Sequence, residues 1–243
     1  MENLTEAKQI IADSKNIYLI PSQEPEAITS TLALFYTLKE LNKNVNLLID
    51  TLPENLKFLA PSLDFISYPK NFVISVPNNV AQISQVYYEK NPDALKIHLT
   101  LESGSIKKDN ISFYFSETKP DLIITVGVKN YQKELSDKLN SFGFLLDAII
   151  LNIDNSKDTS TDSVQVNLKF GKINLAGDSS LSEIIFGLTD SLKKEPATCL
   201  LAGLIIYTEN FKNKLTAGIF QITSDLMNKG ADLQEIINNI KLK

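Results

Sequence analysis

Residues 17–49 constrain the fold of this chain more than any other stretch. A short apolar run at 17–20 predicts a buried strand, and the loop after it carries Glu24 and Glu26. Apolar side chains then recur at helical spacing, and a second apolar run at 45–49 predicts another strand. In parallel α/β sheets, ligands bind where a loop leaves the carboxyl end of a strand and meets a helix N-terminus. The loop with the two glutamates is therefore the first place to look for a functional site.

Strand-like and helix-like segments continue to alternate along the chain. Five further apolar runs predict strands, at 72–76, 95–101, 111–115, 122–126 and 148–153. The last two of these runs are almost wholly apolar, which is typical of central strands that are buried on both faces. We therefore predict an α/β fold, with a mostly parallel, doubly wound sheet and helices on both of its faces.

The segment at about 71–118 is predicted to be a β insertion. Its strand at 95–101 alternates apolar and polar residues, which indicates a half-exposed antiparallel strand. Residues 107–109, after Gly104, are predicted to form the turn of a β-hairpin that returns at Ile111.

Aromatic residues of the insertion, Tyr87, Tyr88 and 113–115, have two interpretations. Packing within the sheet is the commoner role of aromatic side chains in strands. The other interpretation is an exposed patch that binds a partner.

The last third of the chain is predicted to be helical, with helices at 179–193, 197–211, 217–229 and 233–242. Gly230 suits the end of the third helix, because glycine readily adopts the left-handed conformation that follows a helix. No linker or repeat interrupts the chain, so we predict a single domain over residues 1–243.

Charge and composition narrow the class of protein. The net charge of −5 disfavours a role in coating nucleic acid or a membrane surface. All 24 basic residues are lysines, so the chain lacks the guanidinium fork that commonly clamps phosphate. The single cysteine, Cys199, lies in an apolar helical segment and suits a buried position. No apolar run is long enough to span a membrane and none resembles a signal peptide, so we expect a cytoplasmic protein.

The order of these elements resembles the catalytic domain of the DHH phosphoesterase superfamily, which includes oligoribonucleases, 3′-phosphoadenosine-phosphate phosphatases and RecJ-type exonucleases. The matching segments are EAITSTLALFYTLKELNKNV, IILNIDN, FGKINLAGDSSLSEIIFGL, ATCLLAGLIIYTENFKN and GADLQEII. The resemblance implies a site for two Mn²⁺ ions that activate a water molecule and neutralise a phosphate. It also implies a second, smaller substrate-binding domain, for which we find no segment in the sequence.

Most metal-binding positions of the family fall on other residue types in this chain. A histidine and two aspartates of the first motif correspond to Ile20, Glu24 and Glu26. The aspartate that ends a later strand has no counterpart, because the run at 72–76 continues into Pro77 and the run at 122–126 continues into Gly127 and Val128. The Asp-His-His signature becomes Asp154, Asn155 and Ser156, and a late acidic position becomes Tyr207.

The chain has one histidine, His98, which lies outside every family motif. A site with several imidazole ligands for two manganese ions cannot be built from it. We therefore expect no cofactor. If the chain is active, the resemblance implies Mn²⁺ or Mg²⁺ held by vestigial positions Glu24, Glu26 and Asp154.

Each candidate site residue also has a structural interpretation. Glu24 and Glu26 flank Pro25 and could simply place acids at the positive end of a helix. Asp154 could end a strand and accept turn hydrogen bonds.

The candidate substrate-binding residues, Asn155, Ser156, Ser179 and Ser180, have similar alternatives. Asn155 and Ser156 suit a turn, and Ser180 with Glu183 suits a capping box at a helix start.

We predict a phosphoesterase-like protein without hydrolytic activity that acts as a binding or regulatory module for a nucleotide or another phosphate-containing ligand. The first alternative is an atypical metal-dependent phosphoesterase that acts on short oligonucleotides or small nucleotide phosphates. The second is a structural subunit that pairs with a second copy or with an active relative. Neither membrane binding nor extended nucleic-acid binding is expected.

Overall fold

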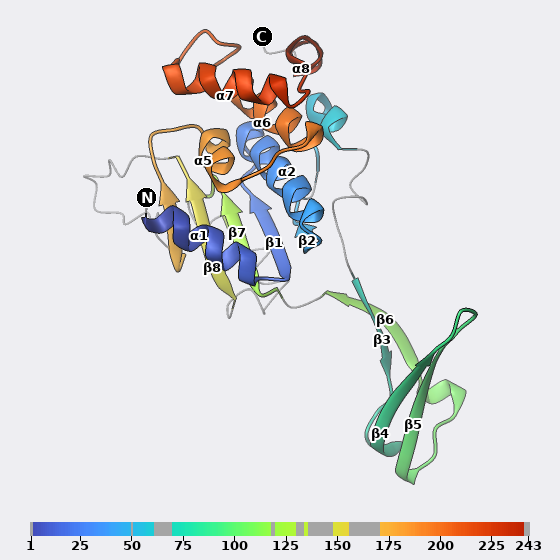
Figure 1. Ribbon diagram of the computed structural model, residues 1–243. Coiled ribbons are helices and arrows are strands. Elements are labelled where there is room, and N and C mark those ends of the chain that lie inside the picture. Colours follow the sequence, from blue (N-terminus) through green and yellow to red (C-terminus); the bar gives the residue numbers. More distant parts are fainter. Residues whose placement is uncertain are drawn as a thin grey trace. The chain divides into compact units, whose positions relative to one another are not determined.

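The computed structural model divides the chain into two compact units (Figure 1). The larger unit comprises residues 1–69 and 119–243, and the smaller one comprises residues 70–118. The structure describes residues 2–49, 51–60, 70–117, 120–129, 134–135, 148–155 and 171–240. The smaller unit covers nearly the same residues as the predicted insertion. The assignment of a single domain to the whole chain stays a prediction.

A five-stranded sheet forms the centre of the larger unit, and all of its neighbouring strands are parallel. In spatial order the strands are β2 (Asn44–Leu47), β1 (Asn16–Pro21), β7 (Leu122–Val126), β8 (Ile149–Asp154) and β9 (Ile173–Ala176). The apolar runs predicted the first four of these strands. They did not predict β9, because its four residues are too short a run to give a clear periodic signal.

The order of the strands fixes where a ligand can bind. β1 lies inside the sheet with β2 on one side and β7 on the other, and the later strands β8 and β9 continue outward from β7. The chain therefore changes direction across the sheet between β1 and β7. In open α/β sheets, this switch point opens a crevice at the carboxyl ends of the strands.

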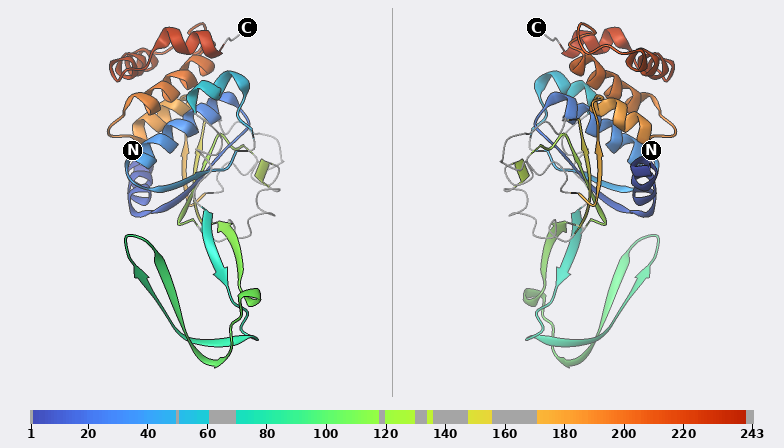
Figure 2. Two further views of the ribbon diagram at one scale, coloured as in Figure 1. Left: turned by 90° about the vertical axis from the view of Figure 1, so that its right-hand side faces the viewer. Right: turned by 90° about the vertical axis from the view of Figure 1, so that its left-hand side faces the viewer.

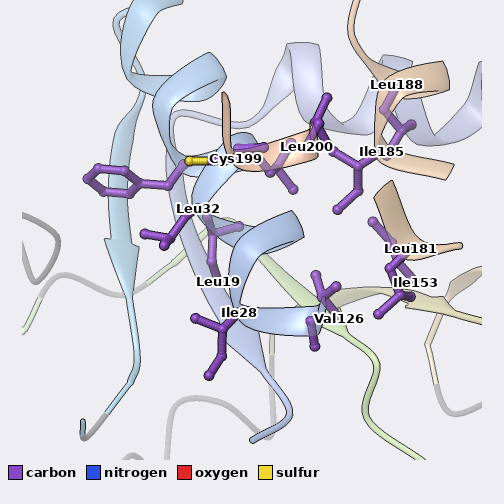
Figure 3. Close-up of a cluster of buried hydrophobic side chains, with 14 of the residues drawn as sticks. Leu19, Ile28, Leu32, Val126, Ile153, Leu181, Ile185, Leu188, Cys199 and Leu200 are labelled. Carbon is purple, nitrogen blue, oxygen red and sulfur yellow. The ribbon is translucent and has the colours of Figure 1, made fainter. Parts of the chain in front are cut away.

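One face of the sheet is covered by α1 (Glu2–Asp13), α2 (Pro25–Glu40), α5 (Leu181–Leu188) and α6 (Lys194–Tyr207). Their apolar side chains and those of the strands form one buried cluster (Figure 3). Leu19 on β1 and Val126 on β7 belong to it, together with Ile28 and Leu32 on α2. Cys199 on α6 is also buried in this cluster, and burial raises the pKa of its thiol. It packs as a small apolar residue, as the sequence predicted.

The opposite face of the sheet has its own apolar cluster. Tyr18 and Ile20 on β1 pack there against Val128 and against Leu135, which lies in a short helical stretch at 134–135. Helical residues thus contact both faces of a parallel sheet. This confirms the predicted α/β class.

The C-terminal part of the chain is helical, as predicted, but two helices have other bounds. The helix predicted at 197–211 is α6, which starts three residues earlier and ends at Tyr207. After α5 and α6 come α7 (Ala217–Asn228) and α8 (Leu233–Ile240), and Gly230 ends α7 with a φ of +96°. The predicted helix at 179–193 was too long at both ends, because Ser180 caps the start of α5 and the helix ends at Leu188. No helix in the described part of the chain is long and apolar enough to cross a membrane.

The smaller unit consists of two antiparallel strand pairs (Figure 2). β3 (Lys70–Ser75) pairs with β6 (Ser112–Glu117), and β4 (Ala81–Lys90) pairs with β5 (Leu95–Gly104). The antiparallel insertion is confirmed. The predicted hairpin turn at 107–109 was wrong, because β5 does not pair with β6.

The hairpin turn lies between β4 and β5, where the main-chain N–H of Asn91 donates to the carbonyl of Ala94. Residues Lys108–Asn110 instead form a short 3-10 helix that leads from β5 to β6. We had not predicted β4, which contains Tyr87 and Tyr88. Without that strand, the apolar run at 111–115 is the next predicted strand after β5 and therefore its predicted partner.

The β4–β5 hairpin has one apolar and one polar face. The cross-strand pairs Val86 with Leu99 and Tyr88 with Ile97 lie on one face, and the pair Tyr87 with His98 lies on the other. The Tyr87 and His98 rings stack at a centroid distance of 4.6 Å. Tyr88 is 72% exposed, so the interpretation of this side chain as part of the sheet packing was wrong.

Phe113 on β6 is also exposed, contrary to the interpretation of sheet packing. Its cross-strand neighbour on β3 is Ile74, which is likewise exposed. Two-stranded pairs of this kind have no second layer to bury such side chains.

Candidate functional site

Four loops meet at the carboxyl ends of the parallel strands, and they carry the candidate residues. Glu24 follows β1, Lys129 follows β7, Asn155 follows β8, and Ser180 follows β9. Because the strands are parallel and adjacent, these loops lie along the same edge of the sheet. We refer to this edge, with Glu24, Glu26, Lys129 and Asp154, as the cleft.

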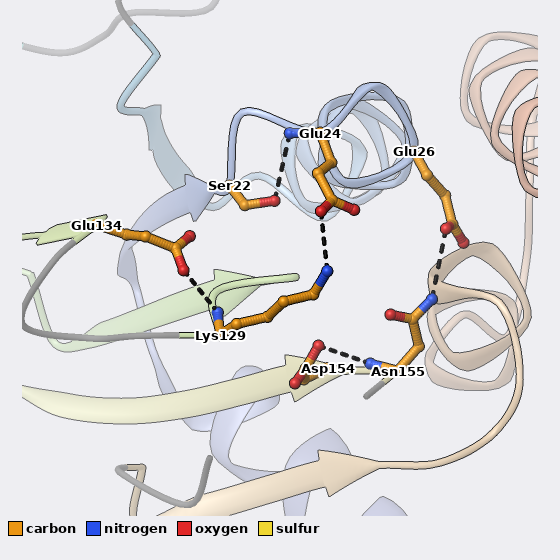
Figure 4. Close-up of polar contacts among 7 residues, drawn as sticks. All are labelled: Ser22, Glu24, Glu26, Lys129, Glu134, Asp154 and Asn155. Atoms are coloured by element: carbon orange, nitrogen blue, oxygen red, sulfur yellow. Dashed lines mark hydrogen bonds and ion pairs between the residues drawn. The ribbon is translucent and has the colours of Figure 1, made fainter. Parts of the chain in front are cut away.

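Glu24 and Glu26 lie at the start of α2, where the structural interpretation placed them. Glu24 is the N-cap residue, Pro25 is the first helical residue, and Glu26 lies in the first turn. The hydroxyl of Ser22 accepts a hydrogen bond from the main-chain N–H of Glu24 at 3.4 Å. The two carboxyl groups have different partners (Figure 4).

Glu24 pairs with a lysine. Lys129 Nζ donates a hydrogen bond to Glu24 Oε1 at 2.8 Å, and the main-chain N–H of Lys129 donates to Glu134 Oε1 at 3.0 Å. In Figure 4 the ammonium lies between the carboxylates of Glu24 and Asp154. The hydrogen bond to Glu24 raises the pKa of Lys129, and the charges of Glu24, Asp154 and Glu134 act in the same direction. Lys129 is therefore a cation at neutral pH.

Glu26 is buried, and its carboxyl group accepts a hydrogen bond from the main chain of another helix. Its Oε1 accepts a hydrogen bond at 2.7 Å from the N–H of Leu181, the first residue of α5. Its Oε2 accepts a longer one, at 3.4 Å, from the side-chain amide of Asn155. Burial raises the pKa of Glu26 to about 7, although the hydrogen bond from Leu181 and the positive charge of Lys214 oppose this effect. The carboxyl group thus joins the start of α2 to the start of α5.

Asp154, which the resemblance matched to the aspartate of the family signature, is 1% exposed at the end of β8. Its Oδ1 accepts a hydrogen bond at 2.8 Å from the main-chain N–H of Asn155. This is the turn hydrogen bond of the structural interpretation. Ser156, the next residue of the signature, lies outside the described residues.

Ser180 forms the predicted capping box of α5. Its hydroxyl accepts from the N–H of Glu183 at 3.0 Å, and Glu183 Oε2 accepts from the N–H of Ser180 at 2.9 Å. Ser180 is fully buried, whereas Ser179 is exposed. The structure therefore assigns Ser180 a helix-capping role, and a role of Ser179 in substrate binding stays a prediction.

Tyr207, at the family's late acidic position, ends α6. Its hydroxyl donates a hydrogen bond to the carbonyl of Asp178 at 3.3 Å, in the loop after β9. The ammonium of Lys214 lies 4.4 Å from the centre of its ring. The charge of Lys214 also acts on Glu26, so a second lysine lies near the cleft.

A cavity of about 270 Å³ opens beside the pair of Glu24 and Lys129. It is lined by Pro21, Ser22, Gln23, Glu24, Gly127, Lys129 and Glu134, from the loops after β1 and β7. This is the switch point of the sheet, the position at which α/β folds bind ligands.

Gly127 closes the position where the family's strand-ending aspartate would be expected. Its φ is +68°, which disfavours any residue with a side chain. A Cβ atom there would approach Ala27 Cβ to 3.0 Å and both Leu181 Cδ1 and Ser22 Oγ to 3.1 Å. A side chain at this position requires these neighbouring side chains to move by a few tenths of an ångström.

The donor set does not fit a pair of divalent cations. Within the described part of the chain, no three His, Cys, Asp or Glu side chains come together in a metal-binding arrangement. The only histidine of the sequence, His98, belongs to the smaller unit. Glu24, Glu26 and Asp154 do share one edge of the sheet, but they bind Lys129, Leu181 and Asn155 respectively.

Comparison with solved structures identifies proteins with a similar fold. An exopolyphosphatase-related protein from Bacteroides fragilis aligns with a TM-score of 0.65 and 18% sequence identity. The alignment covers 98% of this chain and 60% of that protein, so this chain spans about three fifths of its length. Exonuclease RecJ bound to manganese aligns more loosely, with a TM-score of 0.45 and 11% identity over 93% of this chain and 47% of RecJ.

No protein-family model matches the sequence, and no curated protein matches it either. The fold is of the DHH type, as the resemblance predicted. At this level of identity the likeness extends to the fold alone.

Sequence reasoning missed Lys129 as a site residue. The sequence did contain a signal for it, since Lys129 follows the predicted central strand at 122–126 by three residues. We compared that loop only with an acidic family position. A basic residue at the carboxyl end of a central strand points to the same cleft.

Proposed function

We propose that this chain is a DHH-type module that binds a ligand in the cleft and carries out no metal-dependent hydrolysis. The observation that carries the proposal is the donor set of the cleft. Three metal-ligating side chains are not brought together among the described residues, and the sequence has no histidine for this unit. In-line hydrolysis by the two-metal mechanism needs two ions, each with several protein ligands.

The hydrogen bonds of Glu26 support the same proposal. A carboxylate that serves as a metal ligand must offer its oxygens to the ion. Glu26 uses one oxygen for the N–H of Leu181 at 2.7 Å, and its pKa of about 7 leaves much of it protonated at neutral pH. Its role as a link between α2 and α5 competes with any role as a ligand.

The cavity and its position support ligand binding. About 270 Å³ at the switch point accommodates a small molecule rather than an extended polymer. Lys129 lines this cavity with Glu24 and Glu134, and the phosphate group of a ligand such as a nucleotide would replace the Glu24 carboxylate at this ammonium. We propose this ligand class, and the cytoplasm as its location, on these grounds and on the resemblance.

The alternative of an atypical enzyme with one Mg²⁺ or Mn²⁺ has less support. It requires Glu24, Glu26 and Asp154 to face a common ion, whereas the ammonium of Lys129 lies at the Glu24 carboxylate. Pairing with a second copy or an active relative stays a prediction.

An assay of hydrolysis tests the proposal. The full chain is incubated with Mn²⁺ and, in turn, a short oligoribonucleotide, 3′-phosphoadenosine phosphate and polyphosphate. We expect the rate of phosphate or nucleotide release to equal that of the Asp154→Ala variant, which controls for contaminating activity. Release that depends on Asp154 would contradict the proposal and favour the enzyme alternative.

A further inference from the structure

Lys129 is placed by the fold itself at the centre of the cleft. It follows β7, the strand next to β1 at the switch point. Its main-chain N–H is held by Glu134 at 3.0 Å, and its Nζ reaches across to Glu24 at 2.8 Å. The loop that carries it begins at Gly127, whose N–H donates to the carbonyl of Ile153 on β8 at 2.8 Å. Hydrogen bonds therefore hold both the main chain of Lys129 and the end of its side chain.

Negative charge surrounds this ammonium. Glu24, Glu134 and Asp154 all act electrostatically on Lys129, and they come from three different elements of the unit. Carboxylates that face one another across a cleft repel, and a cation among them removes that repulsion. In this protein the cation is a side chain, whereas the resemblance to the DHH superfamily implies metal ions taken up from solution.

We infer that the Lys129 ammonium is a resident cation of this cleft and takes the place of a bound metal ion in attracting the carboxylates of Glu24, Asp154 and Glu134. The inference rests on the proposed function, because it explains how a DHH-type cleft keeps its acidic residues without a metal site. It assigns Lys129 a positioning role, which holds the loops after β1 and β7 together around the cavity.

Exposure sets the size of the expected effect. The side chain of Lys129 is 46% exposed and that of Glu24 is 60% exposed, so solvent weakens their attraction. We expect removal of the ammonium to lower the melting temperature by a few degrees, and not to unfold the protein.

The test compares the thermal stability of variants with and without a divalent cation. In Lys129→Met, which removes the charge and keeps most of the volume, we expect a lower melting temperature that Mg²⁺ raises. KCl at equal ionic strength should raise it less, because a divalent ion can bridge carboxylates through its water ligands. The wild type and Lys129→Arg, which keeps the charge, should respond equally little to Mg²⁺ and KCl.

Two further variants control the experiment. Lys212→Met removes an exposed lysine of the same unit for which the described residues provide no ion pair, and it should behave as the wild type. Glu24→Gln combined with Lys129→Met removes one of the unbalanced carboxylates, so the response to Mg²⁺ should shrink.

Equal melting temperatures and equal Mg²⁺ responses in Lys129→Met and Lys212→Met would overturn the inference. So would a Mg²⁺ response in the wild type as large as that of Lys129→Met. Neither outcome depends on catalysis, so they differ from the outcome that would contradict the proposed function, which is Asp154-dependent hydrolysis.

Discussion

Glu26 is a buried carboxyl group whose ionisation costs the folded state free energy. Its pKa is about 7 in the folded chain, compared with an ordinary value of 4.5, chiefly because burial removes water from the charged form. Below pH 4.5 both the folded and the unfolded states hold the proton, so Glu26 does not affect stability. As pH rises, the unfolded state loses the proton first, and the free energy of unfolding falls until the folded state also ionises above about pH 7.

We therefore predict that Glu26→Gln stabilises the protein at pH 8 by roughly 2–4 kcal/mol and has little effect at pH 4. The glutamine carbonyl can still accept the hydrogen bond from Leu181, so the link to α5 persists. Urea unfolding at both pH values measures the difference. A gain of equal size at pH 4 and pH 8 would show that ionisation is not its cause.

Single residues of the site were predicted unevenly from the sequence. Glu24, Glu26 and Asp154 were placed at the correct edge of the sheet because the apolar strands before them are unmistakable. Their partners were not predictable, since Leu181 lies 155 residues from Glu26 and Lys129 lies 105 residues from Glu24. Only the folded chain brings such distant residues together.

At the junction of β7 with α2 and α5, the packing around Gly127 disfavours an acidic side chain. Gly127 combines a φ of +68° with close approach to Ala27 on α2 and Leu181 on α5. A side chain at Gly127 must adopt an unfavourable conformation, and the neighbouring side chains must move by a few tenths of an ångström.

We predict that Gly127→Asp destabilises the protein by about 2–4 kcal/mol and creates no metal-dependent activity. Gly177→Asp is the matched control, since a Cβ atom there meets nothing nearer than Ser179 N at 4.0 Å. The midpoints of denaturant unfolding compare the two variants. Similar midpoints for both would mean that the junction can accept an acid.

Helices and strands with a strong periodic pattern in the sequence were predicted well. The pairing of the strands in the smaller unit was not. The apolar run of β7 and the cap of α5 at Ser180 are local features that the sequence contains in full. The pairing of β4 with β5, in contrast, depends on which strand lies beside which. Local patterns do not encode that choice, and the missed strand β4 left β5 with the wrong partner.

At the scale of the whole molecule, fold and chemistry have separate determinants. The DHH-type arrangement of sheet and helices depends on apolar residues spread along the larger unit, and these are present. The resemblance assigns the metal chemistry to a few side chains at one edge of the sheet, and we propose that most of these are replaced in this chain. On this proposal, the chain keeps the fold while a lysine in its cleft takes the place of metal ions.

Direct measurement of Mn²⁺ binding to the full-length wild type, by electron paramagnetic resonance at neutral pH, tests this central claim. We predict that the signal of free Mn²⁺ grows in proportion to the ion added, with no saturable site at micromolar concentrations. Saturation at two Mn²⁺ ions per chain would contradict the claim if the Asp154→Ala variant did not show it. The protein would then be better described as a metal-dependent phosphoesterase.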